Sequence, residues 1–113
     1  MTMRYALTLD LKDDRKLIEE YKRLHAPGKA WPAVTKSILD AGVESMEIYL
    51  LGTRLFMIMD VNEKFSFSEK AKADRLDPKV QEWEQLMWKY QQPLPHAAPG
   101  EKWMLMENIF KLP

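Results

Sequence analysis

Hydrophobic and polar residues alternate along residues 3–11, the first patterned segment of the chain. Met3, Tyr5, Leu7 and Leu9 fall on one side of an extended backbone, and polar or small residues fall on the other. An alternation of period two is typical of a strand with one buried face. We therefore expect the fold to begin with a β-strand over these residues.

The hydrophobic period then changes from two to that of a helix over about residues 14–25. Asp13 or Asp14 can cap this helix at its N-terminus, and Pro27-Gly28 ends it. Side chains at this spacing form one buried face of an amphipathic helix. The predicted apolar stripe comprises Leu17, Ile18, Tyr21, Leu24 and His25.

A second helix and a β-hairpin are predicted in the middle of the chain. Pro32 suits a first helical turn, because the amide hydrogen that proline lacks would have no partner there, and Gly42 suits the C-terminal cap. The segment SMEIYLLGTRLFMIMDV then contains two strand-like runs around Gly52-Thr53. This pattern indicates an antiparallel hairpin.

The last part of the chain is expected to contain a helix, a loop and a strand. Residues 64–76 are mixed and indicate a short helix or turn, after which Asp77-Pro78 begins a stronger helix. Residues 91–100 hold three prolines and a glycine and are predicted to form a loop, and residues 102–113 a final strand. The inner face of the stronger helix is predicted to carry Val80, Trp83, Met87 and Tyr90.

The predicted order β-α-β-β-α-β, with one extra short helix, indicates an α+β ferredoxin-like sandwich. Helices then cover one face of an antiparallel sheet, and the other face should be polar if it meets water. The hairpin is apolar on both sides instead, and a large apolar patch usually marks an interface. We therefore predict a homodimer that forms a dimeric α+β barrel. The apolar hairpin residues are Met46, Ile48 and Leu50 opposite Tyr49 and Leu51, and Leu55, Met57, Met59 and Val61 opposite Phe56 and Ile58.

Size and charge narrow the classes of function. The 113 residues are expected to form a single domain, residues 1–113. Lysine plus arginine equal aspartate plus glutamate at 17 each, which disfavours nucleic acid as a partner. No apolar run approaches the length of a membrane span, so we expect no membrane partner. Because Met1 leads directly into the first strand rather than a signal peptide, we expect a cytoplasmic location.

Neither a metal centre nor a cofactor is expected. The chain has no cysteine, which excludes disulfides and thiolate ligands. The two histidines, His25 and His96, have no carboxylate or second histidine at a metal-ligand spacing. The four glycines do not form a phosphate-binding loop.

Aromatic and ionisable residues remain as the candidate chemistry. Each has an ordinary explanation when taken alone, because Tyr21 and Trp83 suit a core and His25 suits the C-terminal end of a helix. Taken together, a tyrosine and a histidine on one helical face beside tryptophans suit acid–base chemistry on a sugar ring. The candidates are Tyr21 and His25 for proton transfer, and Trp83, Trp31, Glu47 and Tyr49 for substrate binding.

The segment EEYKRLHAPGKAWP, residues 19–32, resembles the L-rhamnose mutarotase family. That family has a characteristic EEYxRxH motif, followed after a short turn by Trp-Pro. The resemblance covers essentially the whole chain in order. The later matching segments are IYL at residues 48–50, RLFMIMDV at 54–61, VQEWEQLMWKY at 80–90 and IFKLP at 109–113.

This resemblance implies a dimeric α+β barrel that interconverts the α and β anomers of a 6-deoxy-L-sugar. It implies that Tyr21 transfers protons, that His25 contacts the substrate, that Trp83 lines the pocket and that Trp31 shapes its entrance. Rhamnose enzymes have a tyrosine where Met46 stands here and a second tryptophan where Glu84 stands. We therefore predict a mutarotase of L-fucose or L-rhamnose, and we favour L-fucose.

Two other functions stay open at this point. A dimeric α+β-barrel monooxygenase acting on a polyaromatic or haem substrate has the same predicted architecture, and fold alone does not settle function. A non-catalytic, sugar-binding dimer would hold the sugar without changing the rate of anomer exchange.

Overall fold

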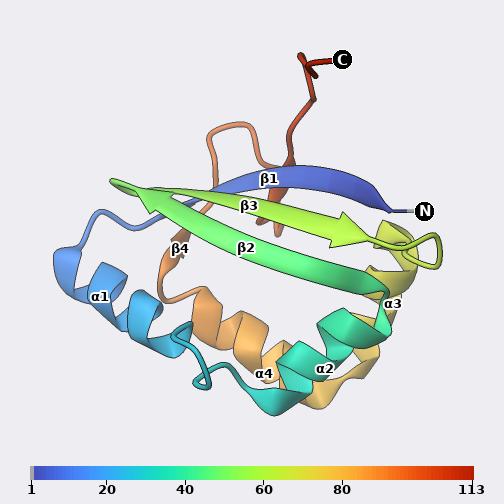
Figure 1. The fold of residues 1–113 in the computed structure, drawn as a ribbon. Helices are drawn as coiled ribbons and strands as arrows, with labels where there is room; N and C mark the ends of the chain where they lie inside the picture. Colours follow the sequence, from blue (N-terminus) through green and yellow to red (C-terminus); the bar gives the residue numbers. More distant parts are fainter. Residues whose placement is uncertain (1) are drawn as a thin grey trace.

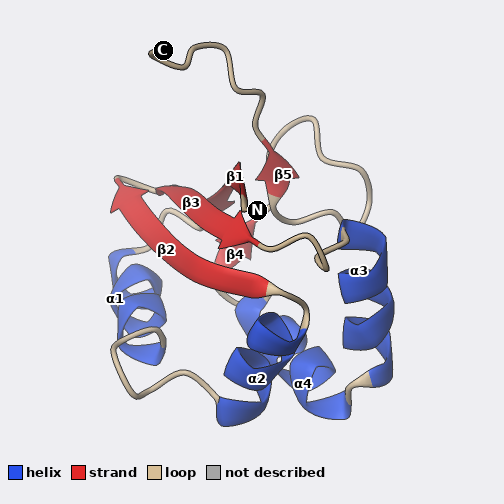
Figure 2. Cartoon of the chain, turned by 45° about the vertical axis from the view of Figure 1, so that its right-hand side comes forward, coloured by secondary structure: helices blue, strands red, loops and turns tan. Residues whose placement is uncertain are grey.

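Within residues 2–113, which the structure describes, all four helices lie on one face of an antiparallel sheet (Figure 1). The structure is a computed structural model, and a turned view keeps the helices on the same side (Figure 2). The elements in chain order are β1 (Met3–Leu11), α1 (Arg15–Leu24), α2 (Pro32–Asp40), β2 (Val43–Leu51), β3 (Arg54–Val61), α3 (Phe67–Leu76), α4 (Pro78–Met87), β4 (Gln91–Gln92) and β5 (Met104–Leu105).

The strand order of the sheet is β2-β3-β1-β4, with β5 also paired to β1. All pairings are antiparallel. The two short strands share the free edge of β1, because β4 pairs with Asp10 and Leu11 while β5 pairs with Leu7 and Thr8. The predicted α+β architecture with helices on one face of an antiparallel sheet is therefore confirmed.

The end of the chain differs from its prediction in two places. Residues 91–92 form β4 rather than part of a loop, and the strand expected over residues 102–113 is confined to Met104–Leu105. Strand β4 pairs with Asp10 and Leu11 of β1, and the last strand pairs only with Leu7 and Thr8 on the same edge. The amide of Met106 donates the last hydrogen bond to β1, to the carbonyl of Ala6, and the chain then leaves the sheet.

Local signals in the sequence explain where the helices begin and end. Asp14 caps α1, since its carboxylate accepts hydrogen bonds from the amides of residues 16 and 17. Asp77 caps α4 in the same way, directly before Pro78, and it also ends α3. Helix α2 begins at Pro32 as predicted, and its C-terminal cap is Ala41 rather than Gly42. Gly42 follows with a φ of 103°, a left-handed conformation that favours glycine.

The core lies between the sheet and the helices. Strands β1 and β3 alternate between buried and half-buried positions, because every second side chain faces the helices. One buried cluster joins this side of the sheet to α1 and α4, and it positions the candidate site. Its buried members are Leu11, Tyr21, Leu55, Trp83, Met87 and Tyr90.

The opposite face of the sheet carries both apolar and charged side chains. Tyr49 pairs in register with Phe56, and Leu51 at the end of β2 is 84% exposed. Ion pairs of Arg4 with Asp60 and of Arg54 with Asp10 stand on the same face. We call this side of the sheet the open face, because within residues 2–113 no helix covers it (Figure 1).

No helix in the described part of the chain combines the length and the apolar character that a bilayer crossing requires. The cytoplasmic location stays a prediction.

Candidate functional site

Tyr21 and His25 lie one turn apart on the face of α1 that meets the core. Their rings stack with centroids 4.2 Å apart and planes inclined by 30°. Tyr21 is 4% exposed, whereas His25, the C-terminal cap of the helix, is half-buried. The predicted pair is therefore assembled, and the histidine is the member that reaches solvent.

Two tryptophans from other elements complete an aromatic cluster around this pair. The ring of Trp83, on α4, meets the ring of His25 edge to face at a centroid distance of 5.3 Å. Trp31, the residue before α2, meets Trp83 in the same way at 5.2 Å. The four residues that the sequence singled out first thus lie side by side, and we call them the aromatic cluster.

The main chain fixes the orientation of the His25 ring. Its Nδ1 lies 2.8 Å from the backbone oxygen of Tyr21, which can only accept a hydrogen bond, so Nδ1 carries the hydrogen. Burial lowers the pKa of His25 below its usual value, although the bond to this carbonyl opposes the shift. At neutral pH the imidazole is therefore uncharged, and Nε2 has a free lone pair that can accept a proton.

The hydroxyl of Tyr21 is an acid whose pKa is shifted upward, opposite to the shift of His25. Burial raises the pKa of Tyr21 to about 12, the side chain of Gln91 acts in the lowering direction, and the charge of Glu84 raises it further. Tyr21 is therefore protonated at neutral pH and can act as a proton donor. The pair thus consists of a neutral acid and a neutral base.

Glu47 and Tyr49 are not brought to the aromatic cluster. They pair in register with Ile58 and Phe56, which face away from the helices, so both stand on the open face. The hydroxyl of Tyr49 donates a hydrogen bond to a carboxylate oxygen of Glu47 at 3.2 Å. The sheet separates these two residues from Tyr21 within one chain, and their predicted contact with substrate is not supported by this placement.

Gln91 is a site residue that the sequence analysis missed. It is 3% exposed, and its side chain acts on the pKa of Tyr21 in the lowering direction. It falls in a segment that was predicted to be a loop, and the only signal nearby was the aromatic residue before it. The pairing of residues 91–92 with β1 is what turns this side chain inward.

An uncovered apolar strip of β2 lies next to the aromatic cluster. Ile48 and Leu50 are on the side of the sheet that faces the helices, yet they are 36% and 37% exposed. Leu50 pairs in register with Leu55, a buried member of the cluster that includes Tyr21. The helix layer therefore leaves an apolar opening beside the candidate site.

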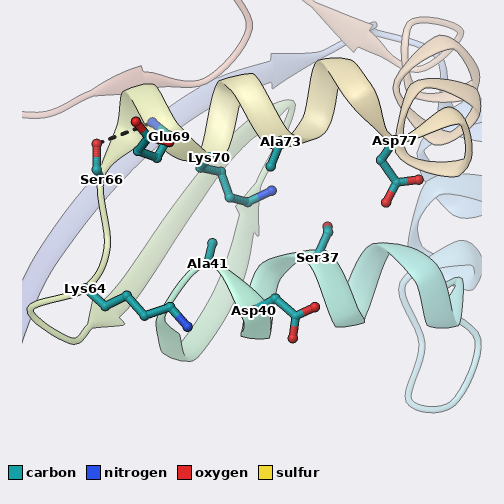
Figure 3. A pocket seen from close by; sticks show the side chains of 9 residues that line it. All are labelled: Ser37, Asp40, Ala41, Lys64, Ser66, Glu69, Lys70, Ala73 and Asp77. Carbon is teal, nitrogen blue, oxygen red and sulfur yellow. Dashed lines mark hydrogen bonds between the residues drawn. The ribbon is translucent and has the colours of Figure 1, made fainter.

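A hollow of about 340 Å³ lies elsewhere, between α2 and α3 (Figure 3). Asp40 and Ser37 face it from α2, and Lys70 faces it from α3. None of its lining residues belongs to the aromatic cluster. Lys70 is also paired with Asp74 at 2.7 Å, so its charge is already balanced. We therefore place the candidate site at the aromatic cluster, where the acid and the base are, rather than at this hollow.

Among the residues that the structure describes, no group of three histidine or carboxylate side chains could hold a metal ion. What the aromatic cluster offers chemically is proton transfer beside apolar ring faces. This combination can move protons on a neutral, hydroxyl-bearing ring that has one apolar side.

Comparisons with known proteins agree with this chemistry. The family model for L-rhamnose mutarotase matches residues 4–112. An L-fucose mutarotase from Xanthomonas campestris pv. campestris is 46% identical over 109 residues, covering 96% of this chain and 87% of that protein. A Dictyostelium discoideum protein, whose name states no activity, is 38% identical over 112 residues, covering 96% of this chain and 88% of that protein.

A solved structure supports the fold independently. The crystal structure of an L-rhamnose mutarotase from Formosa agariphila superimposes with a TM-score of 0.70 at 20% identity, covering 98% of this chain and 99% of that one. The family model and the relative from Xanthomonas each span nearly the whole chain. The chain therefore belongs to the L-rhamnose mutarotase family.

Proposed function

We propose that this protein is an isomerase that interconverts the α and β anomers of L-fucose, with L-rhamnose as a second substrate. Membership of the L-rhamnose mutarotase family supports the reaction, and the 46% identity to an L-fucose mutarotase supports the sugar. The observation that carries the mechanism is the pairing of a neutral acid, Tyr21, with a neutral base, His25, in one ring stack.

Ring opening requires two proton transfers. Nε2 of His25 accepts the proton of the anomeric hydroxyl, and the electron pair left on that oxygen forms the carbonyl bond to C1. The bond between C1 and the ring oxygen breaks, and the hydroxyl of Tyr21 donates its proton to the ring oxygen. The products are an open-chain aldehyde, an imidazolium and a phenolate.

Ring closure reverses these transfers on the other face of the carbonyl. The open chain rotates about the bond between C1 and C2, and the phenolate of Tyr21 takes the proton back as the ring oxygen attacks C1. His25 returns its proton to the carbonyl oxygen, which becomes the new anomeric hydroxyl. Aromatic faces such as Trp83 suit this step, because they contact the apolar side of the sugar without directional bonds that would lock C1.

Anomer exchange measured by NMR tests the proposal. Saturation transfer between the H1 resonances of the two anomers gives the exchange rate with and without the protein, for L-fucose, L-rhamnose and D-glucose. We expect the protein to accelerate exchange without any added cofactor. The acceleration should be largest for L-fucose and second largest for L-rhamnose. Sugar binding with an unchanged exchange rate would identify a non-catalytic sugar-binding protein instead and overturn the proposal.

We also propose that two copies of the chain pack through the open face of the sheet. Tyr49, Phe56 and Ile58 give this face an apolar centre, which suits contact with a second apolar sheet better than water. The segment after β5 leaves the sheet on the side away from the helices (Figure 2) and carries Ile109 and Phe110, which are 87% and 74% exposed.

Sedimentation equilibrium tests this assembly. We expect a dimer for the unaltered chain and a monomer for Ile58→Glu, because a carboxylate at the centre of an apolar interface loses its hydration without gaining a partner. Leu76→Glu is the matched control, since Leu76 is 77% exposed at the end of α3, in the helix layer. A monomeric unaltered chain would refute the proposed dimer and leave the proposed reaction untouched.

A further inference from the structure

We propose that Gln91 is a positioning and specificity-determining residue of the site: its amide nitrogen holds the hydroxyl of Tyr21, and its amide oxygen accepts a hydrogen bond from a sugar hydroxyl. The second role rests on the proposed function. Gln91 would thereby link the proton donor to the recognition of the sugar.

The register of β4 places this side chain in the site. Gln91 pairs with Leu11 of β1, and residues directly opposite each other in an antiparallel pair point to the same side of the sheet. Leu11 is buried in the cluster that contains Tyr21, so Gln91 points into that cluster too. Gln92 pairs with Asp10 and is exposed on the open face.

The amide of Gln91 influences the Tyr21 phenol, and its oxygen has no partner among the described residues. The side chain of Gln91 acts on the pKa of Tyr21 in the lowering direction, as an amide NH₂ group turned toward the phenol does. The oxygen Oε1 is buried and has no hydrogen-bond partner among the described residues. It is the one buried side-chain polar atom in the described part of the chain for which this is so.

An unpaired buried acceptor is a cost that native proteins usually avoid. Most buried polar atoms have a partner, and an exception in a site points to a group that arrives with the ligand. An amide oxygen only accepts hydrogen bonds, so the arriving group must be a donor. A neutral sugar hydroxyl fits, whereas a carboxylate or phosphate does not.

The mechanism gains two properties from this arrangement. The amide that stabilises the phenolate of Tyr21 lowers the energy of the ring-opened state, in which that phenolate forms. The same amide discriminates between sugars, because a sugar without a hydroxyl at the matching place leaves Oε1 unpaired in the complex. We expect loss of Gln91 to affect both kcat and KM.

Gln91→Met separates this role from a structural one. Methionine has a similar length and no polar amide, so it removes the unpaired acceptor while keeping the volume. We expect a melting temperature at or above that of the unaltered protein, a KM for L-fucose raised about tenfold and a lower kcat. A residue needed only for folding would instead give a lower melting temperature and an unchanged KM.

Gln92→Met is the matched control, because it makes the same chemical change at the neighbouring residue on the open face. We expect its kinetic constants to equal those of the unaltered protein. Equal kinetic constants for Gln91→Met and the unaltered protein would overturn the proposal for Gln91.

A second measurement keeps this proposal distinct from the proposed reaction. In ¹⁵N-labelled protein, the side-chain NH₂ resonances of Gln91 should shift when L-fucose is added, while those of Gln92 should not. A shift without any acceleration of anomer exchange would retain the binding role of Gln91 and refute the mutarotase. Acceleration without a shift would retain the mutarotase and refute the role of Gln91.

Discussion

The imidazole of His25 donates its Nδ1 hydrogen to the backbone oxygen of Tyr21, its neighbour one helical turn earlier, across 2.8 Å. The same two residues also stack their rings at 4.2 Å. A shared, poorly hydrated environment disfavours charge on both, so it raises the pKa of the phenol and lowers the pKa of the imidazole. Burial is the largest cause of both shifts, and it favours the neutral form of both the acid and the base.

Removing the phenolic hydroxyl should remove most of the activity. We expect Tyr21→Phe to slow catalysed anomer exchange by about 10²–10⁴-fold, the usual contribution of a positioned acid or base. The ring remains and continues to stack on His25, so the melting temperature should change little. Saturation-transfer NMR on L-fucose gives the rate. Tyr5→Phe is the control, since Tyr5 packs against Phe67 in another part of the fold; full activity in Tyr21→Phe would refute the role of Tyr21.

The pH dependence of activity should be asymmetric. The lowered pKa of His25 predicts that kcat/KM falls only as the pH drops below about 6.5, where the imidazole becomes protonated and can no longer accept a proton. The pKa of Tyr21, raised to about 12, predicts no alkaline loss below pH 10. Measuring exchange from pH 5 to 10 tests both limbs, and a decline between pH 8 and 10 would contradict the acid role of Tyr21.

The same lowered pKa makes stability depend on pH. Because the folded pKa of His25 lies below its unfolded value, the unfolded chain binds more protons in mildly acidic solution. The contribution of the neutral imidazole is therefore present above about pH 6.5 and is lost as the pH falls through the folded pKa. Urea unfolding at several pH values should show this decline in the free energy of unfolding.

Replacing His25 shows how much of the decline in the free energy of unfolding at low pH its imidazole causes. In His25→Gln the decline should be reduced, whereas His96→Gln should leave it intact, because His96 is exposed in a loop. An unchanged decline in His25→Gln would show that other groups cause it.

Residues on the open face should not take part in the reaction within one chain. Tyr49→Phe removes the donor of the hydrogen bond between these side chains and Glu47→Gln removes the charge of its acceptor, but both residues lie across the sheet from Tyr21. We expect the exchange rate per site to stay within about twofold of the unaltered protein. A KM raised tenfold in either variant, with the sedimentation behaviour unchanged, would show that the residue contacts sugar after all.

Much of the fold could be predicted because its signals are local. An aspartate before the first helical turn, as at Asp14 and Asp77, acts on amides two and three residues away, and the alternation along β1 and β3 is set by neighbours in the chain. The two terminal strands could not be placed in this way. Pairing of Gln91 with Leu11 joins residues far apart in sequence, and no local pattern indicates which edge of the sheet is available for pairing.

The site was predictable to the extent that helical spacing fixes it. Tyr21 and His25 are four residues apart on one helix, so their contact follows from the sequence once the helix is recognised. The faces of β2 were ambiguous, because apolar residues occur on both sides, and only the pairing of Tyr49 with Phe56 assigns Tyr49 to the open face. Gln91 required tertiary structure, since its burial depends on a strand of two residues.

Two of the four tryptophans in the chain belong to the aromatic cluster. Indole fluorescence responds to the polarity and mobility of its surroundings. We therefore expect a sugar bound against Trp83 and Trp31 to alter the intrinsic emission of the protein, so that binding can be followed without a label, even in variants too slow to turn substrate over.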